Sequence, residues 1–421
     1  MCTIGVSLVL LFAAAPAQAE ILNGYTYTKH PIVLVGGVND VDALVVWPYF
    51  WDIEPQIEDD AWQWADLFTV KRQKTEFIML SPWQGTRERG INLYWKIRGM
   101  ITLPGQAGTL GSSTVNIIAH SHGATTSRVA MTLLNKEFPG TVRSLTTIAG
   151  PHYGTATADA AKLQCIPSWV TNLVYWGLNR LGDIMTIFTQ LTYNLYNFLF
   201  QNTPGFVPKP NIINDPNFKQ NAYQVAIDFQ QEQMNKFNTD PINGFPCAGV
   251  WKNGTYGIQN GDHPKYGADA TQGDKAGDGL AGKRDVTDPT ATLYYSWTGQ
   301  TDSWWTYLTD ISDISMLATW ALSQMYCKYG AKDPANTTGL DWAYYLYDVL
   351  FNKGENGTYN EIDTDAFIPV TSARFGDYIG TYGPWNHIDE QNHMWGAVSC
   401  FAPDPKAIFR QHANRLQKAG R

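Results

Sequence analysis

The chain has 421 residues, of which 44% are hydrophobic, so it can bury a large core. Only 16% are charged and the formal net charge is −8, which leaves no excess of Lys and Arg for binding a phosphate backbone and excludes nucleic acid as the expected partner. At this length we expect one elaborate unit with long insertions, and a monomer.

The first 19 residues are typical of a secretion signal. Their apolar run is too short to cross a bilayer and ends in Ala-Gln-Ala, the small-x-small pattern of a signal-peptidase site. We therefore expect a mature chain of residues 20–421 that is secreted through the periplasm. Four cysteines remain in it, and an even number in an exported chain favours one or two disulfides, with the pairing open, among Cys165, Cys247, Cys327 and Cys400.

Short apolar runs alternate with helical stretches through the first part of the chain. Strands are predicted at 31–37, 76–80, 115–119 and 142–149, and helices at 89–100 and from the turn at 120–123 to about 137. This alternation predicts βαβ units and a mostly parallel sheet flanked by helices. Between the first two strands, residues 41–74 are aromatic and acidic, and they form either a substrate-facing wall or a helix packed on the sheet.

A serine lies on the turn between strand 115–119 and the helix that follows it. A tight strand-to-helix turn lifts a serine hydroxyl out of the sheet plane, which is the nucleophile elbow of serine hydrolases. Ala119 stands where this pattern most often has Gly, and its side chain is small enough for the turn. Ser121 is therefore the candidate nucleophile, with an ordinary turn that contains a serine as the alternative.

Two main-chain N–H groups are candidates for binding a developing oxyanion. The first strand ends in Gly36-Gly37, a loop whose backbone can approach another group closely, and in serine hydrolases this loop and the residue after the nucleophile each donate one N–H. The positions are Val38 and His122. A plain strand-ending turn is the alternative for the loop.

The alternation stops in the middle of the chain. Residues from about 155 to 245 are expected to form a helical cap, in which 184–200 is a helix that covers an apolar site and moves aside at a lipid surface. An ordinary buried helix is the alternative, and recurring Thr, Gln and Asn disfavour a membrane span. Residues 253–290 are rich in Gly and Asp and are expected to form a loop. His152, after strand 142–149, is expected to be structural.

The last third of the chain supplies an acid and a base. A strand is predicted at 293–297 and a terminal amphipathic helix at 404–419. Between them Asp363 and Asp365 precede His387, and a serine followed by an acid and then a histidine is the order of α/β-hydrolases. A histidine activates the weak serine nucleophile by taking its proton.

Several blocks of this chain resemble, in the same order, the secreted bacterial triacylglycerol lipases that depend on a dedicated foldase. They are PIVLVGG, VNIIAHSHGATTSR, SLTTIAGPHYGT, LYYSWTG, DAFIPV, WNHIDEQN and DPKAIFRQHANRLQKAG. The resemblance implies an α/β-hydrolase fold with a cap, a foldase partner during export and a lipid substrate at an oil–water interface. It implies that Ser121 is the nucleophile, His387 the base and Asp365 the orienting acid, with Asp363 as rival, and that His120 is a packed structural residue.

The same resemblance implies a structural calcium ion beside the histidine loop. Its ligands are the carboxylates of Asp341 and Asp389 and the carbonyls of His393 and Ala397, with Asp348 as a rival for Asp341. Two positions depart from the family pattern. Gly36-Gly37 replaces its usual His-Gly, so we expect the oxyanion loop to be held differently, and Thr371 replaces one half of its disulfide.

These observations predict a secreted triacylglycerol lipase that works through an acyl-enzyme. An esterase or a polyester depolymerase of the same fold is the alternative, in which aromatic residues 41–74 grip a polymer. A lipid-binding relative without activity is a third hypothesis.

Overall fold

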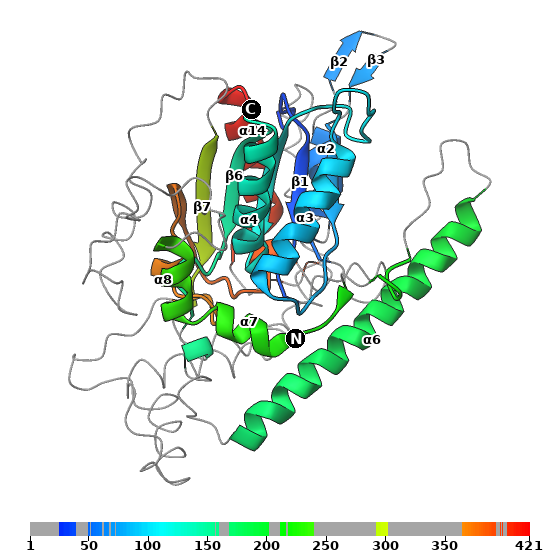
Figure 1. The fold of residues 1–421 in the computed structure, drawn as a ribbon. Coiled ribbons are helices and arrows are strands. Elements are labelled where there is room, and N and C mark those ends of the chain that lie inside the picture. Colours follow the sequence, from blue (N-terminus) through cyan, green and yellow to red (C-terminus); the bar gives the residue numbers. More distant parts are fainter. Residues whose placement is uncertain are drawn as a thin grey trace, which may run out of the picture.

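A parallel sheet forms the centre of the molecule (Figure 1), as the sequence predicted. Its order is β4-β1-β5-β6-β7-β8, and every neighbouring pair runs parallel. The strands are β1 (Ile32–Val35), β4 (Thr75–Ile78), β5 (Val115–His120), β6 (Val142–Ile148), β7 (Leu293–Gly299) and β8 (Asp377–Tyr382). The computed structural model describes residues 25–38, 49–50, 52–60, 63–66, 69–71, 73–155, 157–159, 168–201, 211–215, 218–239, 292–301, 364–392, 396, 398 and 402–421.

Helices cover both faces of the sheet, and its inner strands β1, β5 and β7 are buried along their whole length. Helices α3 (Thr86–Met100) and α4 (His122–Glu137) pack against the face that holds Val33 and Val35. Helices α2 (Ile53–Asp60) and α14 (Pro405–Lys418) pack against the face that holds Ile32 and Leu34. Alternate residues of one strand therefore supply two separate cores. The predicted terminal helix is confirmed as α14.

Residues 49–50 and 53–57 contribute to the core. Tyr49 and Phe50 are buried and pack with Ile53 and Ile57 of α2 against the sheet, so the prediction of a helix packed on the sheet is confirmed there. A small antiparallel hairpin follows, formed by β2 (Gln63–Asp66) and β3 (Thr69–Lys71).

In the described residues between β6 and β7, the stretch predicted to be a cap contains the helices α6 (Ser168–Phe200), α7 (Ala222–Asp228) and α8 (Gln231–Thr239). Helix α6 runs past one end of the sheet, and its last turns extend away from it (Figure 1). The sequence predicted only residues 184–200 of this helix, whereas α6 begins at Ser168. The prediction stopped short because Arg180 and Asp183 interrupt the apolar pattern. In the structure these two side chains form an ion pair of 2.9 Å on the helix surface and the helix continues through them. Within the described residues, no helix has the length and apolar character to span a membrane.

The C-terminal part brings two long loops to the same end of the sheet. After residues 364–369, α12 (Val370–Ala373) leads into β8, and the short 3-10 helix η6 (Asp389–Gln391) follows the cis peptide bond between Gly383 and Pro384. The cysteines and residues 253–290 lie outside the described residues, so the predictions for disulfides and for the Gly/Asp-rich loop stay predictions.

Candidate active site

Ser121 lies on a strained turn between β5 and α4. Its φ is 55° and its ψ is −127°, a conformation that is rare and costly for a residue with a side chain. The turn needs Gly123 because a Cβ there would lie 2.6 Å from the carbonyl oxygens of both Val35 and Gly36. The helix thus starts directly against the end of β1, and the predicted elbow geometry is present.

His387 and Asp365 lie in line with Ser121. His387 Nε2 is 2.7 Å from Ser121 Oγ, and His387 Nδ1 is 2.7 Å from Asp365 Oδ2. All three side chains are buried, with His387 the most exposed at 7%. The structure therefore brings together three residues that the sequence places up to 266 positions apart. Asp363 lies outside the described residues.

The main chain fixes the orientation of Asp365. Its Oδ1 accepts the N–H groups of Phe367 at 2.8 Å and Ile368 at 2.6 Å. The main-chain N–H of His387 donates to the carbonyl of Asp365 at 2.7 Å. Because one carboxylate oxygen is occupied by the loop, the other is left facing the imidazole, and the two loops are held together.

The loop after β1 reaches the nucleophile through its backbone. Buried Arg89 donates from Nη2 to the carbonyls of Gly36 and Gly37, at 2.9 Å each. His122, the first residue of α4, has a buried imidazole that contacts Thr86 Oγ1 at 3.0 Å, and burial together with the positive charge of Arg89 lowers its pKa well below the usual value. The neutral imidazole of His122 is thus packed in the interior. The main-chain N–H of His122 is one of those that have no acceptor within the helix, because they lie at its start.

Apolar side chains of helices α6 and α7 lie beside this site. Tyr175 and Leu178 of α6 and Val225 of α7 share a cluster with Val38 of the loop and Phe367 of the acid loop. The Phe367 ring centroid lies 5.3 Å from that of His387. The surroundings that α6, α7 and Phe367 give to His387 are therefore mainly apolar.

No family model matches the chain. A triacylglycerol lipase of Vibrio cholerae serotype O1 is 25% identical to it over 412 residues, which are 97% of this chain and 95% of that protein. A triacylglycerol lipase of Burkholderia plantarii is 24% identical over 422 residues, with 98% and 92% covered. The chain is a homologue of the bacterial triacylglycerol lipases. This relationship makes it an enzyme of the ester hydrolase class.

Solved structures with similar folds are more distant. A metagenomic carboxyl esterase aligns with a TM-score of 0.45 at 10% identity, over 93% of this chain and 76% of its own. EstA from Clostridium botulinum aligns with a TM-score of 0.42 at 14% identity, over 96% and 90%.

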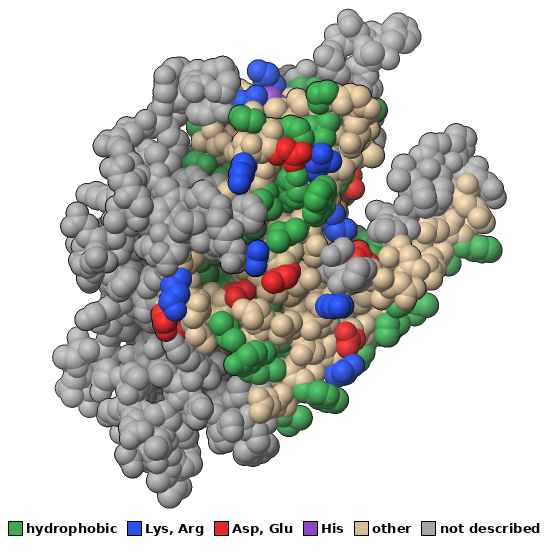
Figure 2. All heavy atoms as spheres, in the orientation of Figure 1, with side chains coloured by type: hydrophobic (Ala, Val, Ile, Leu, Met, Phe, Trp, Pro, Cys, Tyr) green, Lys and Arg blue, Asp and Glu red, His purple; other side chains and the backbone are tan. Residues whose placement is uncertain are grey.

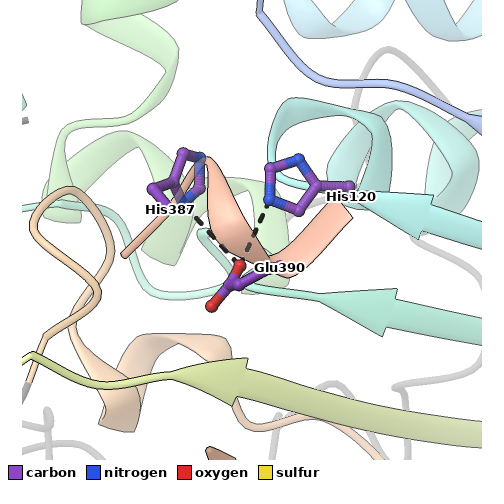
Figure 3. A group of neighbouring side chains, drawn as sticks. All are labelled: His120, His387 and Glu390. Atoms are coloured by element: carbon purple, nitrogen blue, oxygen red, sulfur yellow. Dashed lines mark hydrogen bonds and ion pairs between the residues drawn. The ribbon is translucent and has the colours of Figure 1, made fainter. Parts of the chain in front are cut away.

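A buried acid that the sequence did not reveal lies beside the histidine of this hydrolase. Glu390 points between the rings of His120 and His387 (Figure 3), with Oε2 at 3.2 Å from His120 Nε2 and 4.0 Å from His387 Nδ1. Burial, and then the negative charges of Asp365 and Asp389, raise the pKa of Glu390 well above its usual value. Its position three residues after His387, one helical turn away, is the only sequence signal for it.

The side chains in Figure 3 also have ligand atoms close enough to share a metal ion, since their nearest nitrogen and oxygen atoms lie within 4.8 Å of one another. Both ring nitrogens of His387 are already 2.7 Å from Asp365 and Ser121. A metal at His387 would have to break one of these contacts, so the geometry favours a hydrogen-bonded histidine.

Of the four predicted calcium ligands, the structure describes only Asp389. Asp389 follows His387 by two residues and is buried, and its Oδ2 accepts a hydrogen bond from the main-chain N–H of Asn386 at 2.9 Å. A carboxylate on the histidine loop fits calcium as one oxygen ligand. Asp341, His393 and Ala397 lie outside the described residues, as does Asp348.

His152 has the structural surroundings that were expected of it. Its Nε2 lies 3.0 Å from Thr147 Oγ1, its Nδ1 lies 3.3 Å from Arg128 Nη1, and its ring stacks on Phe375. Burial lowers its pKa well below the usual value. A neutral, packed imidazole at this place takes no part in the Ser121 site.

Proposed function

We propose that the protein is a secreted lipase that hydrolyses carboxylic esters through an acyl-enzyme. The observation that carries the proposal is the line of contacts from Ser121 Oγ through His387 to Asp365, with 2.7 Å at each step. The name of its full-length relatives, triacylglycerol lipase, suggests the substrate.

In this mechanism Ser121 Oγ attacks the ester carbonyl carbon while His387 Nε2 takes its proton. The imidazolium returns that proton to the leaving alkoxide, which departs as the alcohol and leaves the acyl group on Ser121. A water molecule then attacks the acyl-enzyme with the same histidine as base, and releases the acid. Asp365 holds the tautomer in which His387 Nδ1 carries a proton.

The developing oxyanion needs donors that are already in place. We assign this role to the main-chain N–H groups of Val38 and His122, each worth about 3 kcal/mol of transition-state stabilisation. Support comes from the position of His122 at the start of α4, next to Ser121, and from the closeness of the Gly37-Val38 loop to Ser121.

A long apolar stripe on α6 supports action at an oil–water interface. Its members repeat every three or four residues and are 42–70% exposed, namely Leu181, Ile184, Phe188, Leu191, Leu195 and Phe198. Figure 2 shows hydrophobic side chains along the outer edge of this helix. Such a face gains free energy by entering a lipid surface. We therefore assign α6 the role of the cap helix that meets the substrate phase.

A chain-length series of esters tests the proposed function. Wild type and Ser121→Ala are compared on short, medium and long acyl esters, with and without an emulsion. We expect turnover that rises with the emulsion for long chains, and a loss of at least about a thousandfold in kcat for Ser121→Ala. Turnover of short esters alone would favour an esterase. Lipid binding by both proteins with no turnover would make the chain a non-catalytic relative.

We also propose that one calcium ion stabilises the loop of His387. Asp389 would hold it together with Asp341 and the carbonyls of His393 and Ala397, and the ion would supply charge neutralisation at the loop rather than a step of the reaction. EDTA should lower the unfolding midpoint, and added calcium should restore it. Midpoints unchanged by EDTA, in wild type and in Asp389→Asn alike, would refute the ion.

We also propose that the protein is exported with the help of a lipase foldase. Residues 1–19 would be removed, so the secreted protein should begin at Glu20. Expression in a Gram-negative host with and without a lipase foldase tests the partner: active protein in the medium only with the foldase supports it, and equal activity without it excludes it.

A further inference from the structure

The loop that follows β1 lies directly against Ser121. A Cβ built on Gly37 would lie 2.5 Å from Ser121 Cβ and 3.0 Å from Ser121 Oγ. No side chain fits in this gap, so at position 37 the loop approaches the serine with its backbone. The contacts that hold the backbone of this loop therefore determine the positions of the Gly37 and Val38 N–H groups relative to Ser121.

Three buried side chains hold the N–H side of the loop. Gly37 N–H donates to Tyr49 Oη at 2.7 Å, and Tyr49 Oη lies 2.6 Å from His120 Nδ1. His120 Nε2 lies 3.2 Å from Glu390 Oε2. The exposed fractions of Tyr49, His120 and Glu390 are 6%, 1% and 0%, so solvent does not compete for these hydrogen bonds.

The direction of this chain of hydrogen bonds follows from its first donor. The Gly37 N–H can only donate, so the Tyr49 oxygen accepts there, and the Tyr49 hydroxyl can donate to His120 Nδ1. In the tautomer that accepts this bond, His120 Nε2 carries the imidazole proton and donates to Glu390. His120 thus couples the tyrosine to the acid rather than only packing beside Ser121.

Glu390 anchors the far end of the chain to the sheet. Its Oε1 accepts from Thr298 Oγ1 at 3.2 Å and from the Gly299 N–H, both at the end of β7. Glu390 lies in η6, on the turn that begins at His387. The hydrogen bonds thus link the loop after β1, the end of β5, the end of β7 and the histidine turn.

We propose that Tyr49, His120 and Glu390 are positioning residues that fix the oxyanion loop against Ser121. This inference rests on the proposed function. In this chain the three residues, together with Arg89 on the carbonyl side, hold a loop whose first two residues, Gly36 and Gly37, have no side chains to do so. Tyr49 acts on the reaction only through the position of the Gly37-Val38 backbone.

The test compares an oxygen ester with the matching thionoester, in which sulfur replaces the carbonyl oxygen and accepts hydrogen bonds poorly. Tyr49→Phe removes one hydroxyl and keeps the ring. We expect kcat on the oxygen ester to fall about tenfold or more with KM little changed, because a transition-state contact is weakened. The thionoester rate should fall less, so the ratio of oxygen-ester to thionoester kcat/KM should shrink.

Tyr295→Phe is the matched control. Tyr295 is also a buried tyrosine, 7% exposed, but it packs on the α14 side of β7. Its substitution should leave both rates and their ratio at wild-type values. A ratio that is also unchanged in folded Tyr49→Phe would overturn the inference while leaving the proposed function intact. A wild type without any ester turnover would instead refute the proposed function and the inference with it.

Glu390→Gln provides an independent test should Tyr49→Phe prove unstable. A glutamine amide that faces His120 Nε2 favours the other tautomer, which breaks the hydrogen bond from Tyr49, so the ester-to-thionoester ratio should again shrink. In the double variant Tyr49→Phe with Glu390→Gln, the ratio should be no smaller than in the more affected single variant, because both substitutions disrupt the same network. Independent, additive losses would show that Tyr49 and Glu390 act separately, and would overturn the proposed network.

Discussion

The two carboxylate oxygens of Asp365 have different partners. Oδ1 accepts two main-chain N–H groups of its own loop, while Oδ2 lies 2.7 Å from His387 Nδ1. The loop contacts keep the carboxylate in place, so the imidazole contact needs no reorientation during the reaction. The same division predicts how an amide would behave at this position.

Asp365→Asn should keep the fold and lose the activity. Its amide oxygen can accept the N–H groups of Phe367 and Ile368, but its NH₂ group would then face His387 Nδ1 and favour the wrong tautomer. By analogy with other serine triads, kcat should fall about 10⁴-fold while the unfolding midpoint changes little. The measurements are ester turnover and thermal unfolding. Activity within tenfold of wild type would show that another acid orients His387.

At the residue scale, the sequence predicted residues whose role follows from chain order. Ser121 lies on a motif, and an acid and His387 follow it in the order of an α/β-hydrolase; this order left Asp363 and Asp365 open, and the family resemblance favoured Asp365. Tyr49 and Glu390 could not be named in advance, because their partners, Gly37 and His120, are separated from them by 12 and 270 positions and no local pattern reports such contacts. His120 was taken as packing alone, and its two hydrogen-bond partners became visible only in the structure.

Helix α6 has two unlike faces. Its inner side places Tyr175 and Leu178 beside Val38 and Phe367, and its outer side exposes the apolar stripe. A helix of this kind is stable in water only while its inner contacts offset the exposed apolar area. A lipid surface would bury the outer stripe and shift that balance.

Substitutions in the outer stripe should lower the activity on emulsified substrates and leave the activity on dissolved substrates nearly unchanged. Leu191→Ser combined with Leu195→Ser removes apolar area where both side chains are 57% exposed. Hydrolysis of emulsified triacylglycerol should fall severalfold, while kcat/KM for a dissolved short-chain ester stays within about twofold of wild type.

Trp95→Ser is the control for this pair. Trp95 is a similarly exposed apolar side chain, at 59%, on α3 rather than on α6. Equal losses on emulsion for the control and for the α6 variant would show that α6 has no special role at the interface.

At the element scale, the buried elements were the predictable ones. β1 is a continuous apolar run, and β5 and β6 are buried along almost their whole length, because helices cover both of their faces. β8 was not predicted, since its sequence DYIGTY is polar, contains a Gly and lies at the sheet edge with its residues mostly half-buried. Pairing with β7, which is distant in the sequence, makes it a strand.

Four buried histidines couple the stability of the whole molecule to pH. Burial lowers the pKa values of His122, His152 and His412 well below the usual value. Burial and the positive charges of Arg143, Lys29 and Arg421 lower the pKa of His30 to about 4. In the unfolded chain a histidine has a pKa of about 6.5, so below that pH the unfolded state takes up protons that the folded state does not.

The free energy of unfolding should therefore fall as the pH is lowered from about 6.5 toward 4. Glu390 and Asp228, whose pKa values are raised chiefly by burial, act in the opposite direction but are fewer. Thermal unfolding at pH 7 and pH 5 should show a lower midpoint at pH 5, and His30→Gln should reduce the difference. Equal midpoints at the two pH values, or a higher one at pH 5, would contradict this linkage.

The activity of the whole molecule depends on Ser121 as the nucleophile, and covalent labelling tests this role most directly. An organophosphonate ester should add one equivalent to the wild-type protein, with the adduct on the peptide that contains Ser121, and abolish ester turnover in proportion. Ser121→Ala should take up none under the same conditions. Labelling at another residue, or turnover that persists after Ser121 is fully modified, would contradict the account.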